Sequence, residues 1–195
     1  YMNNLFEKIC NLLTEENTEA SLGIKNEIEV FRSSQNINFA PNRATPSLSD
    51  EIVRLLKVSE HILAKQLIEA QKWLVWRKTT IPATQITEEI SNVFYVCPIM
   101  GLDTYIPSKR FRLGFLYQKP NCYYPLHNHN AVETYAVIGG ALDWSDGKEH
   151  RKLTVGDFVH HPSLLPHAFK TKSLGFLGLW HWSGDISPDS YKVLE

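Results

Sequence analysis

The sequence has few cysteines, almost no net charge and no long hydrophobic run. Its three cysteines are scattered without CxxC spacing, which favours reduced thiols over a disulfide framework. A formal net charge of -1 offers no electrostatic footprint for nucleic acid or an anionic membrane. No apolar run is long enough to span a bilayer, and the polar residues near the start do not resemble a secretory signal. We therefore expect a soluble cytoplasmic protein.

The hydrophobic periodicity changes near residue 80. Before that point it is helical: apolar residues recur at i, i+4, i+7 and i+11 within residues 59–76, which predicts an amphipathic helix. The same reasoning predicts helices at residues 3–16 and 24–31, and a Pro-containing loop from residue 39 that leads into a helix starting near Ser47.

After residue 80 glycine, proline, β-branched and aromatic residues dominate. Short strands separated by turn signals are predicted at residues 92–99, 111–118, 133–144, 157–161 and 174–182. Many short strands in such a length indicate a small sandwich or barrel. The sequence thus predicts a mainly β protein with an N-terminal helical region, residues 1–80, packed on a C-terminal β-barrel, residues 81–195.

A cluster of potential metal ligands lies between residues 127 and 135. His127 and His129 point to the same side of a strand, and Glu133 and Tyr135 share a face of the next one. Two imidazoles and a carboxylate suit one divalent transition metal ion, with Fe2+, Zn2+ and Mn2+ all compatible. A fourth ligand could come from a later histidine; the candidates are His160, His161, His167 and His181.

The later histidines differ in their surroundings. His167 follows a Pro-bounded turn and heads a new strand, a suitable ligand position at the rim of a barrel. We interpret four other histidines as rim or surface residues: His61, His150, His160 and His161. Tyr135 and Trp182 have an alternative interpretation as packing residues, because aromatic side chains are common in strands and cores.

These residues resemble the two motifs of the cupin superfamily. The first motif is matched by His127, His129, Glu133 and Gly140, with Asn121 in place of its first glycine, and the second by Gly156, Pro162 and His167, with Leu164 and Thr171 replacing a glycine and an asparagine. The replacements fall at turn and scaffold positions. The resemblance implies a double-stranded β-helix (jelly-roll) barrel with a metal held inside by His127, His129, Glu133 and His167.

A closer resemblance is to the cupin-type dimethylsulfoniopropionate (DMSP) lyases, which also carry a helical region before the barrel. The shared features are Tyr124 before the HxH pair, the ExY pair ending at Tyr135, the late histidine and Trp182. This family splits DMSP into dimethyl sulfide and acrylate by β-elimination. The resemblance implies Tyr135 as the base, with Tyr124 assisting or holding the substrate, and Trp182 in the substrate site.

The chemistry of the elimination suits these residue types. A metal-bound carboxylate stabilises the charge that develops when the α-proton is removed, and a nearby cation favours a tyrosine phenolate. The sulfonium end of the substrate favours aromatic faces, and alternation puts Trp180 and Trp182 on one face with His181 opposite. Regular alternation would place Tyr123, and not Tyr124, beside His127, unless a bulge near the intervening proline re-aims the chain.

Two other functions are compatible with the sequence. One is a different cupin metalloenzyme, a dioxygenase or isomerase acting on a small carboxylate. The other is a non-catalytic module that binds a small molecule. In each case we expect a small-molecule partner, no nucleic acid or membrane, and a monomer or homodimer whose N-terminal helices form a lid, a dimer interface or a support.

Overall fold

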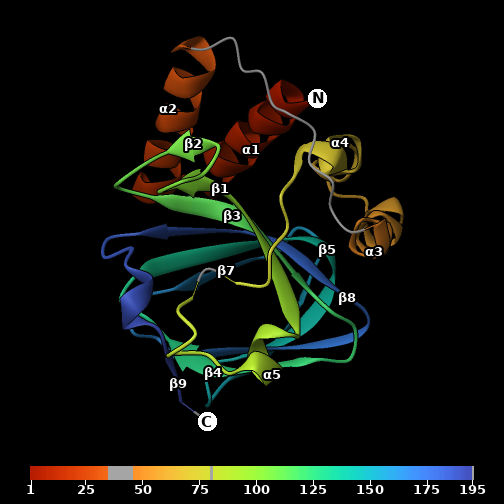
Figure 1. The fold of residues 1–195 in the computed structure, drawn as a ribbon, viewed down its shortest axis with the longest axis vertical. Helices are drawn as coiled ribbons and strands as arrows, with labels where there is room; N and C mark the ends of the chain where they lie inside the picture. Colours follow the sequence, from red (N-terminus) through yellow and green to blue (C-terminus); the bar gives the residue numbers. More distant parts are fainter. Residues whose placement is uncertain (35–45, 80, 195) are drawn as a thin grey trace.

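The computed structural model describes residues 1–34, 46–79 and 81–194. The helices of the first seventy residues gather at one end of the molecule, the strands form a curved sheet beside them, and the short helix at Glu88–Ser91 lies near the other end (Figure 1). The helices are α1 (Met2–Glu16), α2 (Glu19–Ser34), α3 (Pro46–Lys57), α4 (Ala64–Ala70) with the 3-10 turn η1 (Gln71–Trp73), α5 (Glu88–Ser91) and the late 3-10 turn η2 (Pro188–Ser190). None of the helices in these ranges is long and apolar enough to cross a membrane.

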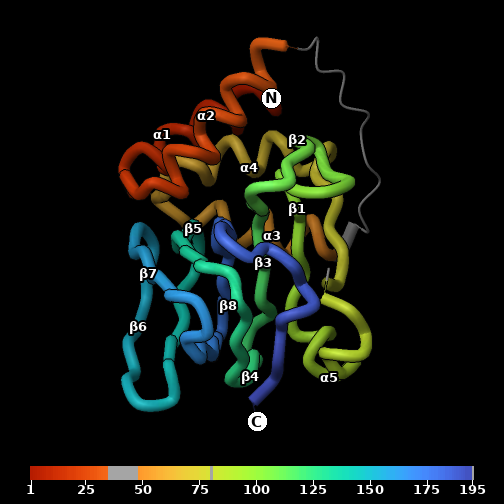
Figure 2. Tube along the Cα trace, turned by 90° about the vertical axis from the view of Figure 1, so that its left-hand side faces the viewer, coloured from red at the N-terminus to blue at the C-terminus, as the bar shows by residue number. Residues whose placement is uncertain are grey.

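The strands are β1 (Phe94–Gly101), β2 (Ile106–Pro107), β3 (Arg112–Gln118), β4 (Tyr123–Asn128), β5 (Val132–Ser145), β6 (His150–Thr154), β7 (Phe158–His161), β8 (His167–Ser183) and β9 (Lys192–Val193). All five strands predicted by residue range are present, as is β4, the strand expected to carry His127, and β2, β6 and β9 are additional. The long strand β8 pairs antiparallel with β3, β4 and β5, and β5 also pairs with β6 and β7. These pairings curve the sheet around an interior (Figure 2).

The helix predicted over residues 59–76 is shorter than expected. Two side chains near its predicted start accept hydrogen bonds from backbone N–H groups: the N–H of His61 donates to Ser59 Oγ, and that of Leu63 to His61 Nδ1. Such local bonds compete with helical ones, so α4 begins only at Ala64. Helix α3 is present as predicted, whereas the loop predicted before it, and the side chain of Ser47, lie outside the described part of the chain.

Strand alternation divides the buried apolar side chains into two clusters. Ile138 and Leu179 belong to the cluster that joins the helices to the outside of the sheet. Val137 and Trp180 belong to the cluster that fills the interior. Because neighbouring residues in a strand point to opposite faces, the same strands hold the helices on one side and build a site on the other. The domain boundary between residues 80 and 81 stays a prediction.

The two residues that stand in place of motif glycines, Asn121 and Leu164, adopt a backbone conformation that usually requires glycine. Asn121 has φ 54° and Leu164 has φ 66°, both in the left-handed region. Asparagine tolerates this region, whereas leucine is strained there by roughly 1–2 kcal/mol. At Gly140 (φ +74°) a Cβ atom would lie 2.1 Å from the carbonyl oxygen of Gly175, so this position admits no side chain.

A buried ion pair joins the end of α1 to β8. The Glu16 carboxylate lies 2.8 Å from His181 Nε2, and the two side chains are only 7% and 5% exposed. Burial alone would raise the pKa of Glu16, but the hydrogen bond and charge of His181 outweigh burial and lower it. His181 points to the opposite face of β8 from Trp180 and Trp182, as predicted from alternation. The ion pair therefore links helix α1 to the outer face of the strand that carries both tryptophans.

This pair predicts a pH-dependent stability. The pKa of Glu16 is depressed in the folded state, so its contribution is present above the ordinary carboxyl pKa and is lost as the pH falls through the folded-state value. Glu16→Gln should lower the free energy of unfolding by about 1–2 kcal/mol at neutral pH. The difference from wild type should shrink below about pH 4.

Urea unfolding at several pH values measures this difference. Glu15→Gln is the matched control, because Glu15 is the exposed neighbour and its replacement should change stability by less than about 0.5 kcal/mol. Equal losses in both variants, or a loss independent of pH, would contradict the stabilising role of the pair.

Candidate metal centre

Three predicted ligands meet inside the sheet. His129 follows β4, Glu133 lies near the start of β5, and His167 begins β8. One donor atom from each of the three lies within 4.8 Å of the others, and all three residues are buried. Segments almost forty residues apart therefore converge because β8 pairs with both β4 and β5.

Backbone carbonyls orient the two imidazoles of this group. Nδ1 of His129 donates to the carbonyl of Ala131 at 3.1 Å, and Nδ1 of His167 to that of Leu165 at 3.0 Å. A carbonyl only accepts, so these nitrogens carry the hydrogen and Nε2 of each ring faces Glu133. Both Nε2 atoms lie 3.2 Å from Glu133 Oε2.

The donor geometry fits a transition metal ion. Donor atoms about 2.1 Å from one ion lie about 3–3.4 Å from one another, and the two separations from Glu133 Oε2, 3.2 Å each, fall in that range. The buried Nε2 of His167 makes no hydrogen bond in the described part of the chain, because the nearby carboxylate oxygen of Glu133 has no hydrogen to donate to it. A buried nitrogen lone pair without a donor is an expected feature of a metal ligand. The His–Glu–His group therefore forms a candidate site for a divalent ion.

His127, the fourth predicted ligand, lies beside this group and not within it. Its Nδ1 donates to the carbonyl of Pro125 at 2.7 Å, in the same manner as the other two imidazoles. Its ring stacks on Tyr124, with centroids 4.2 Å apart, and lies 4.2 Å from the ring of His167. Burial and the charge of His167 hold its pKa well below the usual value, so it is neutral. Its role as a ligand stays a prediction.

Glu133 is the centre of the hydrogen-bond network. Its Oε1 accepts the indole N–H of Trp182 at 2.6 Å, while Oε2 faces the imidazoles. Burial would raise the pKa of this carboxyl, but the charge and hydrogen bond of His129 and the hydrogen bond of His161 hold it well below the usual range. Glu133 is thus a carboxylate, the form that binds a metal.

His161 is the main correction to the sequence interpretation. We expected it at the rim or surface, yet it is fully buried, stacked 3.9 Å from the ring of His167. Trp144 donates its indole N–H to His161 Nε2 at 2.9 Å, so the hydrogen on His161 is at Nδ1, which donates to Glu133 Oε2 at 3.2 Å. Burial lowers its pKa to about 3 and keeps the ring neutral. His161 alternates with its exposed neighbour His160, a signal visible in the sequence.

His161 should act as a positioning residue for Glu133. His161→Phe keeps a ring for stacking but removes the hydrogen bond to the carboxylate, and should weaken metal affinity by about 10–100-fold. Competition with a chromogenic chelator measures this affinity. His160→Phe is the control, because that side chain is exposed, and should leave affinity unchanged. An unchanged affinity in His161→Phe would show that Glu133 needs no such support.

Tyr124 reaches the site through an irregularity in β4. The register with β8 shifts between Tyr124 and His127, which confirms the bulge predicted near Pro125. As a result Tyr124 is 3% exposed, whereas Tyr123 is 46% exposed. Tyr191, which no sequence pattern indicated, donates its hydroxyl hydrogen to Tyr124 at 2.9 Å.

Tyr135 is buried beside Glu133 on the interior face of β5. Burial, followed by the negative charge of Glu133, raises its pKa well above the usual value. Burial likewise raises the pKa of Tyr124. In the absence of a cation both tyrosines are therefore neutral phenols.

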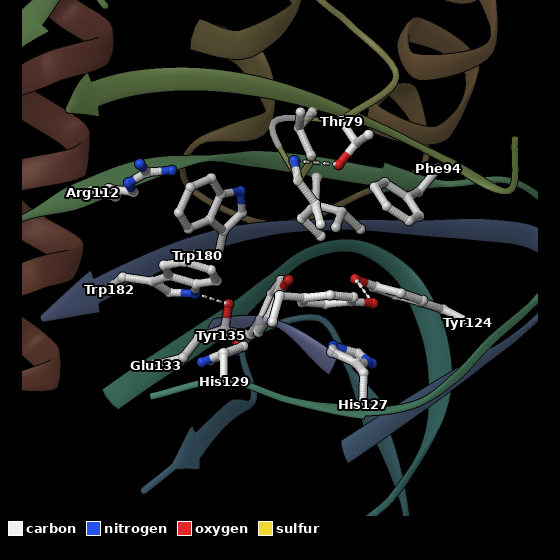
Figure 3. Close-up of a pocket in the computed structure, with 14 residues that line it drawn as sticks. Thr79, Phe94, Arg112, Tyr124, His127, His129, Glu133, Tyr135, Trp180 and Trp182 are labelled. Carbon is white, nitrogen blue, oxygen red and sulfur yellow. Dashed lines mark hydrogen bonds and ion pairs between the residues drawn. The ribbon is translucent and has the colours of Figure 1, made fainter. Parts of the chain in front are cut away.

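A cavity of about 40 Å³ lies over these side chains. Figure 3 shows His129, Glu133 and Tyr135 along one wall, with Phe94 and Tyr124 on one side and Arg112, Trp180 and Trp182 on the other. Six of the seven predicted site residues line the cavity; the seventh, His167, does not line it and instead packs its ring against those of His127 and His129. Phe94, Arg112 and Tyr191 were not predicted: the first two begin strands, and Tyr191 follows a short turn without periodic signal.

A curved antiparallel sheet with a buried His–Glu–His group and helices on its outer face defines a cupin barrel. A family model described as dimethylsulfoniopropionate lyase matches residues 41–177, more than half of the chain. The chain therefore belongs to the DMSP lyase family.

Individual relatives agree with this assignment. The chain is 39% identical over 112 residues to the DMSP lyase DddQ of Ruegeria pomeroyi, a match that covers 57% of this chain and 55% of that protein. The match thus spans about half the length of this curated relative.

Solved structures share the fold. The crystal structure of DddQ from Ruegeria pomeroyi superposes with a TM-score of 0.61 at 22% identity, covering 87% of this chain and 95% of that one. A crystal structure reported with the DMSP lyases RdDddP and RnDddQII superposes with a TM-score of 0.66 at 22% identity. The superposition covers 87% of this chain and 90% of that one. At this identity the likeness shows the fold, which is a double-stranded β-helix preceded by helices, as predicted.

Proposed function

We propose that this chain is a metal-dependent DMSP lyase that releases dimethyl sulfide and acrylate by β-elimination. The observation that carries the proposal is the buried group of His129, Glu133 and His167 beside two tyrosines, in a member of the DMSP lyase family. The relative DddQ is named as a lyase of this substrate.

The ligand group supports the first requirement of the reaction. A divalent ion held by His129, Glu133 and His167 would act as a Lewis acid on the substrate carboxylate and would bring positive charge that favours a tyrosine phenolate. Fe2+, Zn2+ and Mn2+ all suit this donor set. His127, adjacent to His167, is the proposed fourth ligand.

We assign Tyr135 as the base. It lies two residues from Glu133 on the same face of β5 and lines the cavity. As the phenolate it would take the proton from the α-carbon; the electrons of that C–H bond form the new C=C bond, and the bond from the β-carbon to sulfur breaks. Dimethyl sulfide leaves as a neutral molecule, so no acid is required. The proton remains on Tyr135 and passes to solvent after acrylate departs.

Aromatic side chains support binding of the sulfonium group. Phe94 and Tyr124 lie with ring centroids 4.6 Å apart on one side of the cavity, and the hydroxyls of Tyr124 and Tyr191 bond to each other. Aromatic faces attract a cation, more strongly when water is excluded. We assign Tyr124 to hold the substrate or assist the base. Trp182, through its hydrogen bond to Glu133, joins the substrate site to the ligand group.

Headspace gas chromatography tests the proposal. Purified chain is incubated with DMSP and Fe2+, Zn2+ or Mn2+, with a chelator as control, and dimethyl sulfide is quantified. Metal-dependent release is the expected result. No release from protein shown to be metal-loaded would overturn the proposal, and oxygen consumption with small carboxylates would then test dioxygenase chemistry.

A further inference from the structure

A second cavity adjoins the metal-site cavity. It has a volume of about 290 Å³, and its lining includes Arg77, Asp103, Arg112 and Trp180. Arg112 and Trp180 also line the metal-site cavity. These two side chains therefore form the partition between the two cavities, on the side of the site opposite Phe94 and Tyr124 (Figure 3).

Both side chains of the partition bury a donor without an acceptor. The indole N–H of Trp180 has no hydrogen-bond partner in the described residues, although the side chain is only 6% exposed. The buried Nε of Arg112 likewise has none. Leaving a buried donor unpaired is unfavourable, so two such donors beside one cavity indicate a ligand that accepts hydrogen bonds.

The packing of the partition holds Trp180 close to β3. Trp180 lies opposite Gly114 in the register of β3 and β8, and Arg112 lies opposite Trp182. A Cβ atom at position 114 would lie 2.9 Å from Cζ2 of Trp180, so the glycine makes room for the indole. The Arg112 guanidinium lies 5.9 Å from the ring centre of Trp182. Both donors are thus built into the strands that carry the site.

The positive charge of Arg112 favours an anionic ligand at the partition. Burial lowers the pKa of Arg112, but a guanidinium remains protonated in proteins. The charge of Asp189 acts on Arg112 and partly offsets the effect of burial on its pKa, but no carboxylate among the described residues lies close enough to form an ion pair with it. The Arg112 guanidinium lies at one end of the Trp180 ring and the indole nitrogen at the other (Figure 3), so the planar set of guanidinium donors matches a carboxylate and the indole adds a further donor to the same cavity wall.

We propose that Arg112 and Trp180 form a carboxylate-binding subsite for a small monocarboxylate at the edge of the metal-site cavity. The natural occupant, on the proposed function, is the carboxylate of the substrate as it enters or of acrylate as it leaves. The subsite also sets the orientation of a zwitterion: Arg112 attracts the carboxylate and repels the sulfonium, which is directed toward Phe94 and Tyr124 on the other side.

Calorimetric titration with propionate tests the subsite without turnover. The full chain is used as purified, with metal content matched between variants, and propionamide is the neutral analogue of the ligand. Wild type should bind propionate and not propionamide. Arg112→Met should weaken propionate binding by about 10–100-fold. Arg110→Met is the control, because that arginine is 72% exposed two positions away and its loss should have no effect.

Two further variants keep the test decisive if Arg112→Met folds poorly. Arg112→Lys retains the charge but not the planar fork, and should weaken binding less than methionine does. Trp180→Phe removes the indole N–H and should weaken binding while leaving the charge in place. Equal propionate affinity in wild type, Arg112→Met and Trp180→Phe would overturn the subsite, as would equal binding of propionamide.

This result is separable from that of the lyase assay. Arg112-dependent propionate binding without release of dimethyl sulfide would retain the subsite and reject the proposed function. Release of dimethyl sulfide with propionate affinity independent of Arg112 would retain the lyase and reject the subsite.

Discussion

Tyr135→Phe should reduce the release of dimethyl sulfide by about 10²–10⁴-fold while leaving the metal content unchanged. The substitution removes only the hydroxyl, so the ring continues to pack 5.0 Å from Phe169 inside the barrel. No ligand atom is lost, because the metal group consists of His129, Glu133 and His167. The measurement is the initial rate by headspace chromatography, together with metal content by elemental mass spectrometry.

Tyr95→Phe is the matched control for this substitution. Tyr95 is half-buried in β1 and does not line the metal-site cavity, so the loss of its hydroxyl should leave the rate near that of wild type. A near-normal rate in Tyr135→Phe would show that another group removes the α-proton. Tyr124→Phe would then be the next variant, because Tyr124 is the other tyrosine that we assign to the substrate.

His129→Ala and His167→Ala should each lose both metal and activity. Either change removes an Nε2 donor and leaves the buried Glu133 carboxylate with fewer partners. Because loss of a residue that only orients a ligand weakens affinity by about 10–100-fold, loss of a ligand should weaken it by more than about 100-fold. Equilibrium dialysis against each metal, followed by the lyase assay, measures the two losses together.

His160→Ala serves as the control for both variants. Its ring is exposed and bonds to the hydroxyl of Thr134 on the outer side of the sheet, so metal and activity should be retained. His127→Ala then tests the fourth predicted ligand. Loss of metal comparable to that in His167→Ala would establish His127 as a ligand, whereas full metal content with reduced activity would assign it to the substrate side.

Strand alternation was a reliable guide wherever the strands are regular. It predicted that Trp180 and Trp182 share the interior face, and that His181 faces the other way. The same rule applied to β7 would have placed His161 inside, because Val159, two residues earlier, is buried. The surface interpretation of His161 was wrong because adjacent histidines were treated alike, although neighbours in a strand occupy opposite faces.

Local signals were less reliable where side chains compete with backbone bonding. The helix over residues 59–76 was predicted too long, since Ser59 and His61 accept backbone hydrogen bonds that a helix would use. By contrast the proline at position 125 correctly indicated a bulge, because proline cannot donate a bond to the sheet.

The sequence by itself determined the helix-then-strand order, the barrel class and the placing of the candidate ligands His129 and Glu133 on interior faces, because periodicity and short-range spacing decide which face each side chain occupies. Only the tertiary structure decided which distant residues meet. It joined Glu16 to His181, placed Tyr191 against Tyr124, and set Arg112 and Trp180 between two cavities. These contacts depend on the register between strands and on how helices pack against the sheet, and neither is encoded in the spacing of residues along the chain.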